Sequence, residues 1–233
     1  MLKWATYLFL SVVCLNSCAQ DHYRQERLKM VSGQIVARGI DDPEVVAAMK
    51  KVERHLFVPE SYESRAYADG PLPIGFGQTI SQPYIVAYMT QVLKLDSTDH
   101  VLEVGTGSGY QAAILAEICK QVYTIEVIEG LGNRAKDLLD RLGYENIHVK
   151  IGDGYKGWPE QAPFDAIIVT CAPTHIPEQL QVQLKEGGRM IIPVGERYVQ
   201  ELVYLEKKDG RLKKKSVLPV LFVPMIDEDG KPY

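Results

Sequence analysis

The sequence predicts an α/β fold: a mainly parallel β-sheet with helices on both faces, an N-terminal helical cap and a C-terminal antiparallel hairpin. The first observation is that short, almost wholly apolar segments alternate with helical segments between residues 100 and 194. Strands that crossover helices bury on both faces have this pattern. The second observation is Asp209-Gly210, a typical hairpin turn between two further apolar segments.

The 233 residues have an average globular composition, with 46% hydrophobic and 24% charged residues. This argues against a disordered, collagen-like or coiled-coil protein. The 26 basic and 30 acidic residues give a net charge of −4, so no net positive field would attract nucleic acid. The four cysteines form no CxxC pair and the five histidines show no metal-ligand spacing, so we expect neither a disulfide scaffold nor a metal site. We expect one catalytic domain, residues 23–233, that acts as a monomer.

Residues 1–19 differ from the rest and have the pattern of an export signal. Lys3 is followed by an apolar run from Trp4 to Leu15, which is too short to span a bilayer comfortably. The end of this segment resembles a bacterial lipoprotein signal, in which a lipidated Cys18 would attach the protein to a membrane. Cleavage after Ala19 and an N-terminal helix packed on the core are the alternatives. We expect the cell envelope or periplasm as the location, with the cytoplasm as the alternative.

The first half of the remaining chain, residues 23–96, reads as helices followed by a loop. Apolar residues at helical spacing and the helix start Asp41–Glu44 predict helices over residues 23–58. Three glycines and three prolines in residues 66–83 predict a long ordered loop, a kind of segment that is commonly functional. An apolar helix over residues 84–95 follows.

Residues 97–233 alternate between strands and helices. We expect helices near residues 112–118 and 130–142. The predicted strands are His100–Val104, Val122–Ile125, Ile147–Ile151, Phe164–Val169 and Arg189–Val194, and the hairpin pairs Leu202–Leu205 with Ser216–Val223.

A glycine-rich loop follows the first of these strands. Gly105, Gly107 and Gly109, with Thr106 between the first two, would let the backbone approach a ligand at the start of a helix. The spacing is GxGxG, whereas nicotinamide and flavin dinucleotide sites use GxGxxG. A nicotinamide oxidoreductase is therefore disfavoured.

Three acidic residues lie at the ends of successive strands. Glu103, just before the glycines, would suit an ammonium group, and Glu126 could accept both hydroxyls of a ribose. Asp153, next to Gly154, would suit an adenine amino group. A single one of these acids, Glu126 for instance, could equally be a solvated residue at a strand end. The ordered set indicates a pocket for S-adenosylmethionine (SAM).

A second polar cluster precedes the helix that begins near residue 84. Gln78, Thr79, Ser81 and Gln82 lie among turn residues, where they could cap that helix or donate hydrogen bonds to a substrate carboxylate. Ser81 lacks the glycine-flanked turn of a hydrolase nucleophile, which argues against covalent serine catalysis.

Six segments, in order along residues 23–225, closely resemble the protein-L-isoaspartate O-methyltransferase family. The resemblance implies a Rossmann-like SAM-dependent methyltransferase fold. It also implies methyl transfer from SAM to the free α-carboxylate of isoaspartyl residues, which begins the repair of aged proteins. By the same resemblance, Ser81 matches the active-site position of the family, whose members usually begin near Tyr23. The segments are Leu72–Gly75, Gly77–Pro83, Val101–Gln111, Gly152–Gly154, Pro163–Thr170 and Gly187–Gly195.

The implied nucleophile is a carboxylate with a pKa near ~3.5, which is ionised at neutral pH and needs no general base. The enzyme would therefore act by aligning the reactants and excluding water. We expect Ser81 to orient the carboxylate, with Thr79 and Gln82 supporting its loop. A methyltransferase for small molecules and a catalytically silent binding module are the alternatives. Because SAM is made in the cytoplasm, an exported enzyme would need its cofactor delivered.

Overall fold

The structure is a computed structural model that describes residues 21–196 and 198–233. The predicted export segment lies outside the described residues. Among the described residues, no helix is long and apolar enough to cross a membrane.

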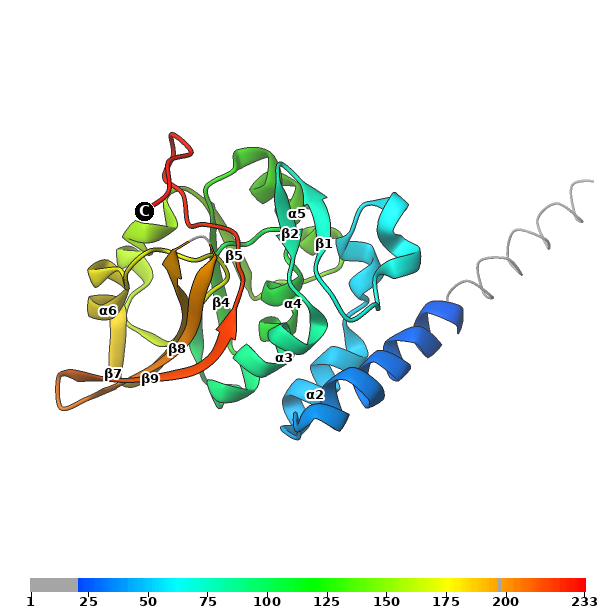
Figure 1. The fold of residues 1–233 in the computed structure, drawn as a ribbon, viewed down its shortest axis with the longest axis horizontal. Helices are drawn as coiled ribbons and strands as arrows, with labels where there is room; N and C mark the ends of the chain where they lie inside the picture. Colours follow the sequence, from blue (N-terminus) through cyan, green and yellow to red (C-terminus); the bar gives the residue numbers. More distant parts are fainter. Residues whose placement is uncertain (1–20, 197) are drawn as a thin grey trace, which may run out of the picture.

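The described residues contain one large sheet, with strand order β5-β4-β3-β6-β7-β8-β9, and a separate pair, β1-β2 (Figure 1). Neighbouring strands from β5 to β7 are parallel, and β8 and β9 continue the sheet in antiparallel fashion. The predicted α/β fold is therefore confirmed. The strands are β3 (His100–Val104), β4 (Gln121–Glu126), β5 (Ile147–Ile151), β6 (Phe164–Val169), β7 (Leu184–Glu196), β8 (Val199–Lys208) and β9 (Arg211–Val220).

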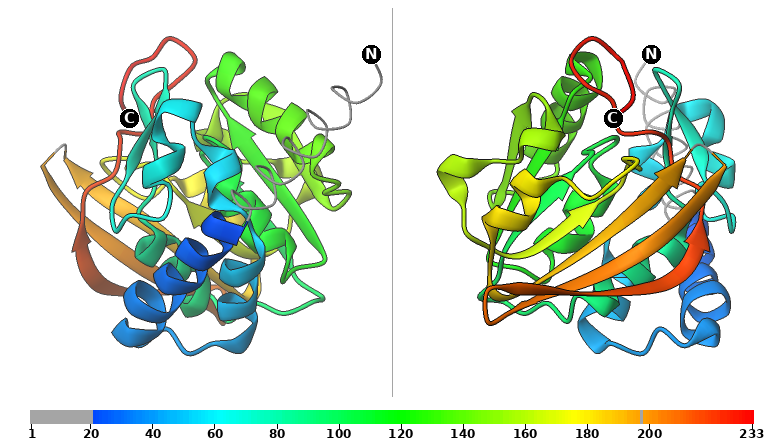
Figure 2. Two further views of the ribbon diagram at one scale, coloured as in Figure 1. Left: turned by 90° about the vertical axis from the view of Figure 1, so that its right-hand side faces the viewer. Right: turned by 60° about the vertical axis from the view of Figure 1, so that its left-hand side comes forward.

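Helices cover both faces of the sheet, as the sequence predicted (Figure 2). Alternation along β3 divides the interior into two cores, since Val101 packs in one and Leu102 in the other. Buried residues of α2, α3, α4 and α5 belong to the first core, and Leu180 of α6 belongs to the second. Helix α6 was not predicted. The helices are α2 (Pro43–Lys51), α3 (Pro83–Val92), α4 (Tyr110–Ala116), α5 (Glu129–Arg141) and α6 (Glu178–Gln183).

The N-terminal cap is helical over most of the predicted range. Residues 21–30 are helical and lead into short turns of π and 3₁₀ helix. Helix α2 begins as predicted, because Asp42 Oδ1 accepts hydrogen bonds from the backbone N–H groups of Glu44 (3.0 Å) and Val45 (3.1 Å). Two further 3₁₀ turns, η3 (Arg54–Phe57) and η4 (Glu60–Arg65), precede the predicted loop.

The prediction that residues 66–83 form only a loop is wrong. They contain the antiparallel hairpin of β1 (Leu72–Gly75) and β2 (Gln78–Ile80). Leu72 and Ile74 are buried and alternate with exposed residues, which gives the segment the period of a strand. Gly75 and Gly77 lie at the turn of this hairpin, Pro73 lies within β1, and Pro83 begins α3.

The C-terminal hairpin is confirmed and is longer than predicted. Asp209 and Gly210 join β8 to β9, both with positive φ (54° and 68°), as a tight hairpin turn requires. Strand β9 forms one edge of the sheet, with β5 at the other, and exposed lysines such as Lys213, Lys214 and Lys215 discourage another strand from pairing with β9.

Candidate active site

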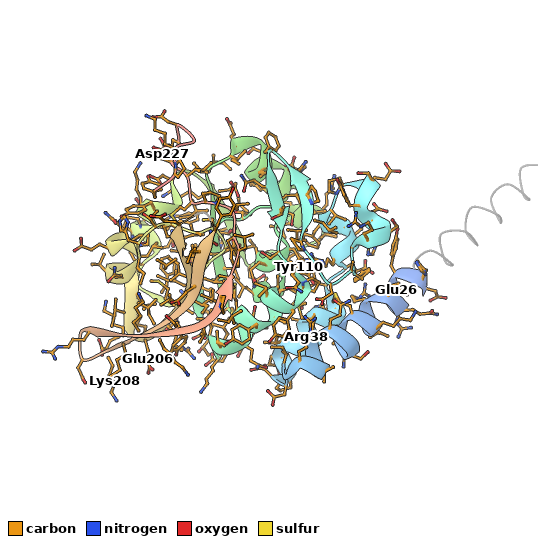
Figure 3. All side chains as sticks on the ribbon, in the orientation of Figure 1. Glu26, Arg38, Tyr110, Glu206, Lys208 and Asp227 are labelled. Carbon is orange, nitrogen blue, oxygen red and sulfur yellow. The ribbon has the colours of Figure 1, made fainter. Side chains whose placement is uncertain are left out.

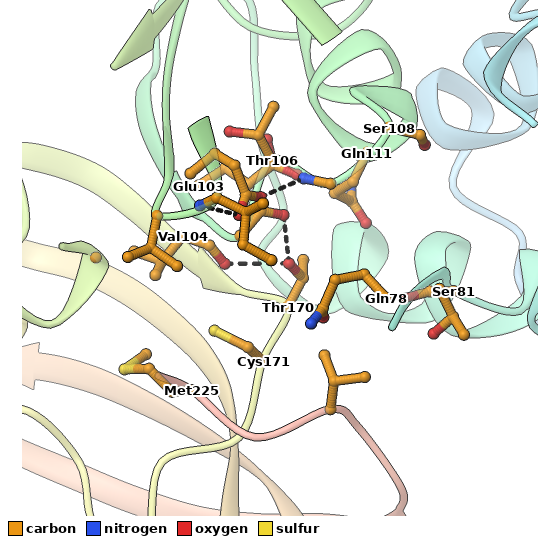
Figure 4. A pocket seen from close by; sticks show the side chains of 18 of the residues that line it. Gln78, Ser81, Glu103, Val104, Thr106, Ser108, Gln111, Thr170, Cys171 and Met225 are labelled. Carbon is orange, nitrogen blue, oxygen red and sulfur yellow. Dashed lines mark hydrogen bonds between the residues drawn. The ribbon is translucent and has the colours of Figure 1, made fainter. Parts of the chain in front are cut away.

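A cavity, partly open to solvent, lies at the carboxyl ends of β3, β4 and β6. Open α/β sheets bind ligands at this edge. Figure 4 shows Gln78 and Ser81 on one side of the cavity, and Glu103 with Thr106 on another. The structure thus brings two predicted segments to one cavity. They are the polar segment around Ser81, residues 78–82, here called the substrate loop, and the glycine-rich segment, residues 105–109, here called the cofactor loop or glycine loop.

The glycine loop forms one wall of the cavity and has a conformation that requires glycine. Gly105, Gly107 and Gly109 have φ of +98°, +56° and +87°. A Cβ atom on Gly105 would also clash with Thr170 Oγ1, which donates a hydrogen bond to the Gly105 carbonyl oxygen (2.7 Å). Gly109 lies behind the wall as the N-cap residue of α4. The chain can therefore pass close to a ligand here.

Glu103 lines the cavity with an unsatisfied carboxyl oxygen. The residue is fully buried, and its Oε2 accepts a hydrogen bond from Thr124 Oγ1 (2.6 Å), which also bonds Thr106 Oγ1 (2.7 Å). Oε1 has no partner among the described residues, and burial raises the pKa of Glu103 to about 8. A buried, unpaired oxygen destabilises the protein unless a ligand supplies the partner. The ammonium group of SAM has the chemistry to do so, and the predicted role of Glu103 fits the structure.

Glu126 organises the same wall. Its Oε2 accepts a hydrogen bond from Gly107 N (2.8 Å), and its Oε1 accepts one from Ile128 N (3.0 Å). Only 7% of Glu126 is exposed, so it is no solvated strand-end residue. Burial raises its pKa, although the backbone hydrogen bonds oppose the rise. Each carboxylate oxygen keeps a second lone pair, which a ribose hydroxyl could use.

Asp153 is buried beside the cavity without lining it, whereas its neighbour Gly154 is part of the wall. Asp153 Oδ1 accepts a hydrogen bond from Tyr155 N (3.0 Å). Its Oδ2 accepts one from the Tyr233 hydroxyl (2.6 Å) and lies 3.2 Å from Lys156 Nζ. The role of Asp153 towards adenine stays a prediction.

The substrate loop forms the opposite wall through Gln78, Thr79 and Ser81. The Ser81 carbonyl oxygen accepts a hydrogen bond from Arg54 Nη2 (2.7 Å), while the Ser81 hydroxyl has no partner among the described residues. Gln82 does not line the cavity and donates a hydrogen bond to Asp69 Oδ1 (2.7 Å), so the supporting role of Gln82 stays a prediction. Because α3 has no side-chain cap, helix capping does not explain these polar groups.

A sequence profile of the family described as protein-L-isoaspartate(D-aspartate) O-methyltransferase matches residues 25–230. The chain belongs to this family. A protein-L-isoaspartate O-methyltransferase from Picosynechococcus sp. is 56% identical over 85% of this chain and 89% of its own length. One from Opitutus terrae is 54% identical over 95% of each.

Solved structures of the family agree with this fold. A protein-L-isoaspartate O-methyltransferase superposes with a TM-score of 0.81 at 32% identity, over 88% of this chain and 67% of its own. One from Plasmodium falciparum, in complex with S-adenosyl-L-homocysteine, has a TM-score of 0.74 at 28% identity, over 84% of this chain and 96% of its own. The family resemblance and the methyltransferase fold predicted from the sequence are confirmed.

Sequence reasoning missed several residues of the cavity. Thr170 follows β6 and its hydroxyl donates hydrogen bonds to the Val104 and Gly105 carbonyl oxygens, but a single threonine after a strand is no distinctive signal. The segment Val223–Ile226 also lines the cavity, because Ala172 N donates to Val223 O (2.8 Å) and Met225 N donates to Ala172 O (2.9 Å). No local pattern predicts that long-range pairing.

Glu126→Ala should lower the affinity for S-adenosylhomocysteine at least tenfold, by roughly 1.5–3 kcal/mol. The substitution removes a ligand acceptor and leaves the N–H groups of Gly107 and Ile128 unpaired. Isothermal titration calorimetry measures the change, with Glu129→Ala, an exposed acid at the start of α5, as the control. Equal affinity for S-adenosylhomocysteine in both variants would show that Glu126 does not bind the cofactor.

Proposed function

We propose that this protein transfers a methyl group from SAM to the free α-carboxylate of L-isoaspartyl residues in damaged proteins and peptides, and so begins their repair. The family match over residues 25–230 carries this proposal. The cavity supports it, because an acidic oxygen on Glu103 and the Ser81 hydroxyl on another wall both lack partners among the described residues.

Residues on one wall of the cavity would bind the cofactor, and residues on the opposite wall would bind the substrate. Bound SAM would supply an electrophilic methyl group. Glu103 would hold the ammonium group of the cofactor and Glu126 its ribose, while the glycine loop allows close approach. Ser81 would donate a hydrogen bond to the substrate carboxylate and orient it towards the methyl group. The carboxylate is already ionised at neutral pH, so the protein has no proton to remove.

Radiolabelled methyl transfer to an isoaspartyl peptide tests the proposal. We expect methylation of this peptide and none of the otherwise identical aspartyl peptide, with a base-labile methyl ester as the product. Methylation of small metabolites in place of the peptide would contradict the proposal that isoaspartyl residues are the substrate. Binding of S-adenosylhomocysteine without any methyl transfer would indicate a silent binding module.

We also propose that residues 1–19 direct export and that a lipidated Cys18 attaches the protein to a membrane. One charge, an apolar run and a following cysteine support this. Cell fractionation and mass spectrometry of the mature N-terminus test it, and unprocessed protein in the cytosol would refute it. Gel filtration of the mature protein tests the expectation of a monomer.

A further inference from the structure

Arg54 is a fully buried cation between the substrate loop and the cofactor loop. Its Nε donates to Ala66 O (2.8 Å), before the β1-β2 hairpin, and its Nη2 donates to Ser81 O (2.7 Å), after the hairpin. Its guanidinium carbon lies 4.8 Å from the ring centroid of Tyr110, the first residue of α4. Tyr110 is labelled in Figure 3 and is itself buried in the interior.

The positive charge of Arg54 has no acidic partner. Within residues 21–196 and 198–233, none of the ion pairs includes Arg54, and its buried Nη1 lacks any hydrogen-bond acceptor. Burial lowers the pKa of the guanidinium to about 10, so the group remains charged at neutral pH. A buried charge destabilises a protein unless an opposite charge compensates it.

The place of this charge indicates what compensates it. Arg54 binds the backbone of Ser81, which leaves the Ser81 hydroxyl available to the substrate. Arg54 itself does not line the cavity, so a substrate carboxylate bound by that hydroxyl would lie across residue 81 from the guanidinium. Attraction between opposite charges is screened less in a protein interior than in water.

We propose that Arg54 is a positioning residue that supplies the positive charge for recognition of the substrate carboxylate next to Ser81. This inference rests on the proposed function. It assigns to Arg54 the discrimination between an isoaspartyl carboxylate and its neutral carboxamide, while Ser81 orients the reacting oxygen.

The proposal predicts an effect on KM more than on kcat. The carboxylate loses its negative charge as it becomes an ester, so a nearby cation stabilises the bound substrate at least as much as the transition state. Arg54→Gln should therefore raise KM for an isoaspartyl peptide about tenfold, and Arg54→Lys, which keeps the charge, should stay within about threefold of the wild type. The KM for SAM should remain unchanged in both.

A neutral analogue separates charge from structural support. A peptide with the α-carboxamide in place of the carboxylate should inhibit the wild type at least about tenfold more weakly than the isoaspartyl peptide binds, and Arg54→Gln should not weaken the inhibition further. Arg27→Gln is the matched control. Arg27 is a buried arginine of the same cap, but it is paired with Glu53 (3.2 Å) and makes no contact with Ser81. Its loss should lower the unfolding temperature and leave the peptide KM unchanged.

Three results would overturn the proposal. One is an equal rise of the peptide KM in Arg54→Lys and Arg54→Gln, and another is a joint fall of kcat and SAM affinity without a change in peptide KM. Equal binding of the acid and amide peptides by the wild type would also overturn it, even if neither Arg54 variant folds. The absence of methyl transfer to isoaspartyl peptides by the wild type would instead refute the proposed function.

Discussion

Ser81→Ala is expected to lower kcat for methyl transfer to an isoaspartyl peptide about 100-fold, with unchanged affinity for S-adenosylhomocysteine. The Ser81 hydroxyl lines the cavity and has no partner in the part of the chain that the structure describes, and its removal would leave the carboxylate without the proposed orienting hydrogen bond. The backbone of the loop should persist, because Arg54 holds the carbonyl group of residue 81 and not its side chain.

Steady-state kinetics with saturating SAM measure this effect, and calorimetry with S-adenosylhomocysteine shows whether the cofactor site is intact. Ser64→Ala is the matched control, since Ser64 is exposed on η4 in the same N-terminal region. A kcat for Ser81→Ala within twofold of this control would exclude the orienting role of Ser81.

Glu103→Gln is expected to have opposite effects on cofactor binding and on stability. Affinity for S-adenosylhomocysteine at about pH 7.5 should fall roughly 10- to 100-fold, because a neutral amide does not pair with the ammonium group as a carboxylate does. Oε1 of Glu103, which has no partner among the described residues, is the oxygen that would pair with the ammonium group. The variant should nevertheless be the more stable protein without ligand at alkaline pH.

The sign of the stability effect follows from the raised pKa of Glu103. Its value of about 8 lies above the ordinary 4.5, so the folded protein binds this proton more tightly than the unfolded chain. The resulting stability is complete below the unfolded pKa and is lost as the pH rises through about 8. Glutamine remains neutral, so Glu103→Gln should unfold at a higher temperature than the wild type near pH 8.5, with little difference near pH 4.5.

Thermal unfolding of the ligand-free proteins across this pH range, together with calorimetry, checks both effects. Thr98→Ala, at an exposed turn before β3, is the control for substitution near the strand. Wild-type affinity for S-adenosylhomocysteine in Glu103→Gln would contradict the assignment of Glu103 to the ammonium group. If the wild type were more stable than the variant near pH 8.5, burial would not raise the pKa of Glu103 in the folded protein.

The central strands could be predicted closely because a buried strand is a run of consecutive apolar residues. β3 and β6 have the predicted bounds, since a strand in the middle of a covered sheet is apolar over its whole length or nearly so. β5 also has the predicted bounds, although it is an edge strand in which Ile147, Val149 and Ile151 alternate with polar residues. β7 extends further than predicted, because its first part carries exposed charged residues. β1 and β2 were missed because glycine and proline obscured their short alternation.

The candidate site also contains residues that local sequence predicts and residues that it does not predict. Glu103, Glu126 and the glycines follow directly from strand ends and could be predicted from local sequence. The family resemblance pointed to Ser81. Arg54 and the segment Val223–Ile226 were not predicted, since they reach the site only through contacts with residues distant in the chain.

The sequence by itself determined the α/β architecture, the family and the cofactor loop, because hydrophobic periodicity and glycine spacing act within a few residues. Only the tertiary structure decided that Asp153 bonds Tyr233 and that, among the described residues, one oxygen of Glu103 has no partner and the buried Arg54 has no acidic partner. Burial and pairing of a charged group depend on every element packed around it. The energetic cost of a charge is therefore set by the assembled fold and not by its neighbours in sequence.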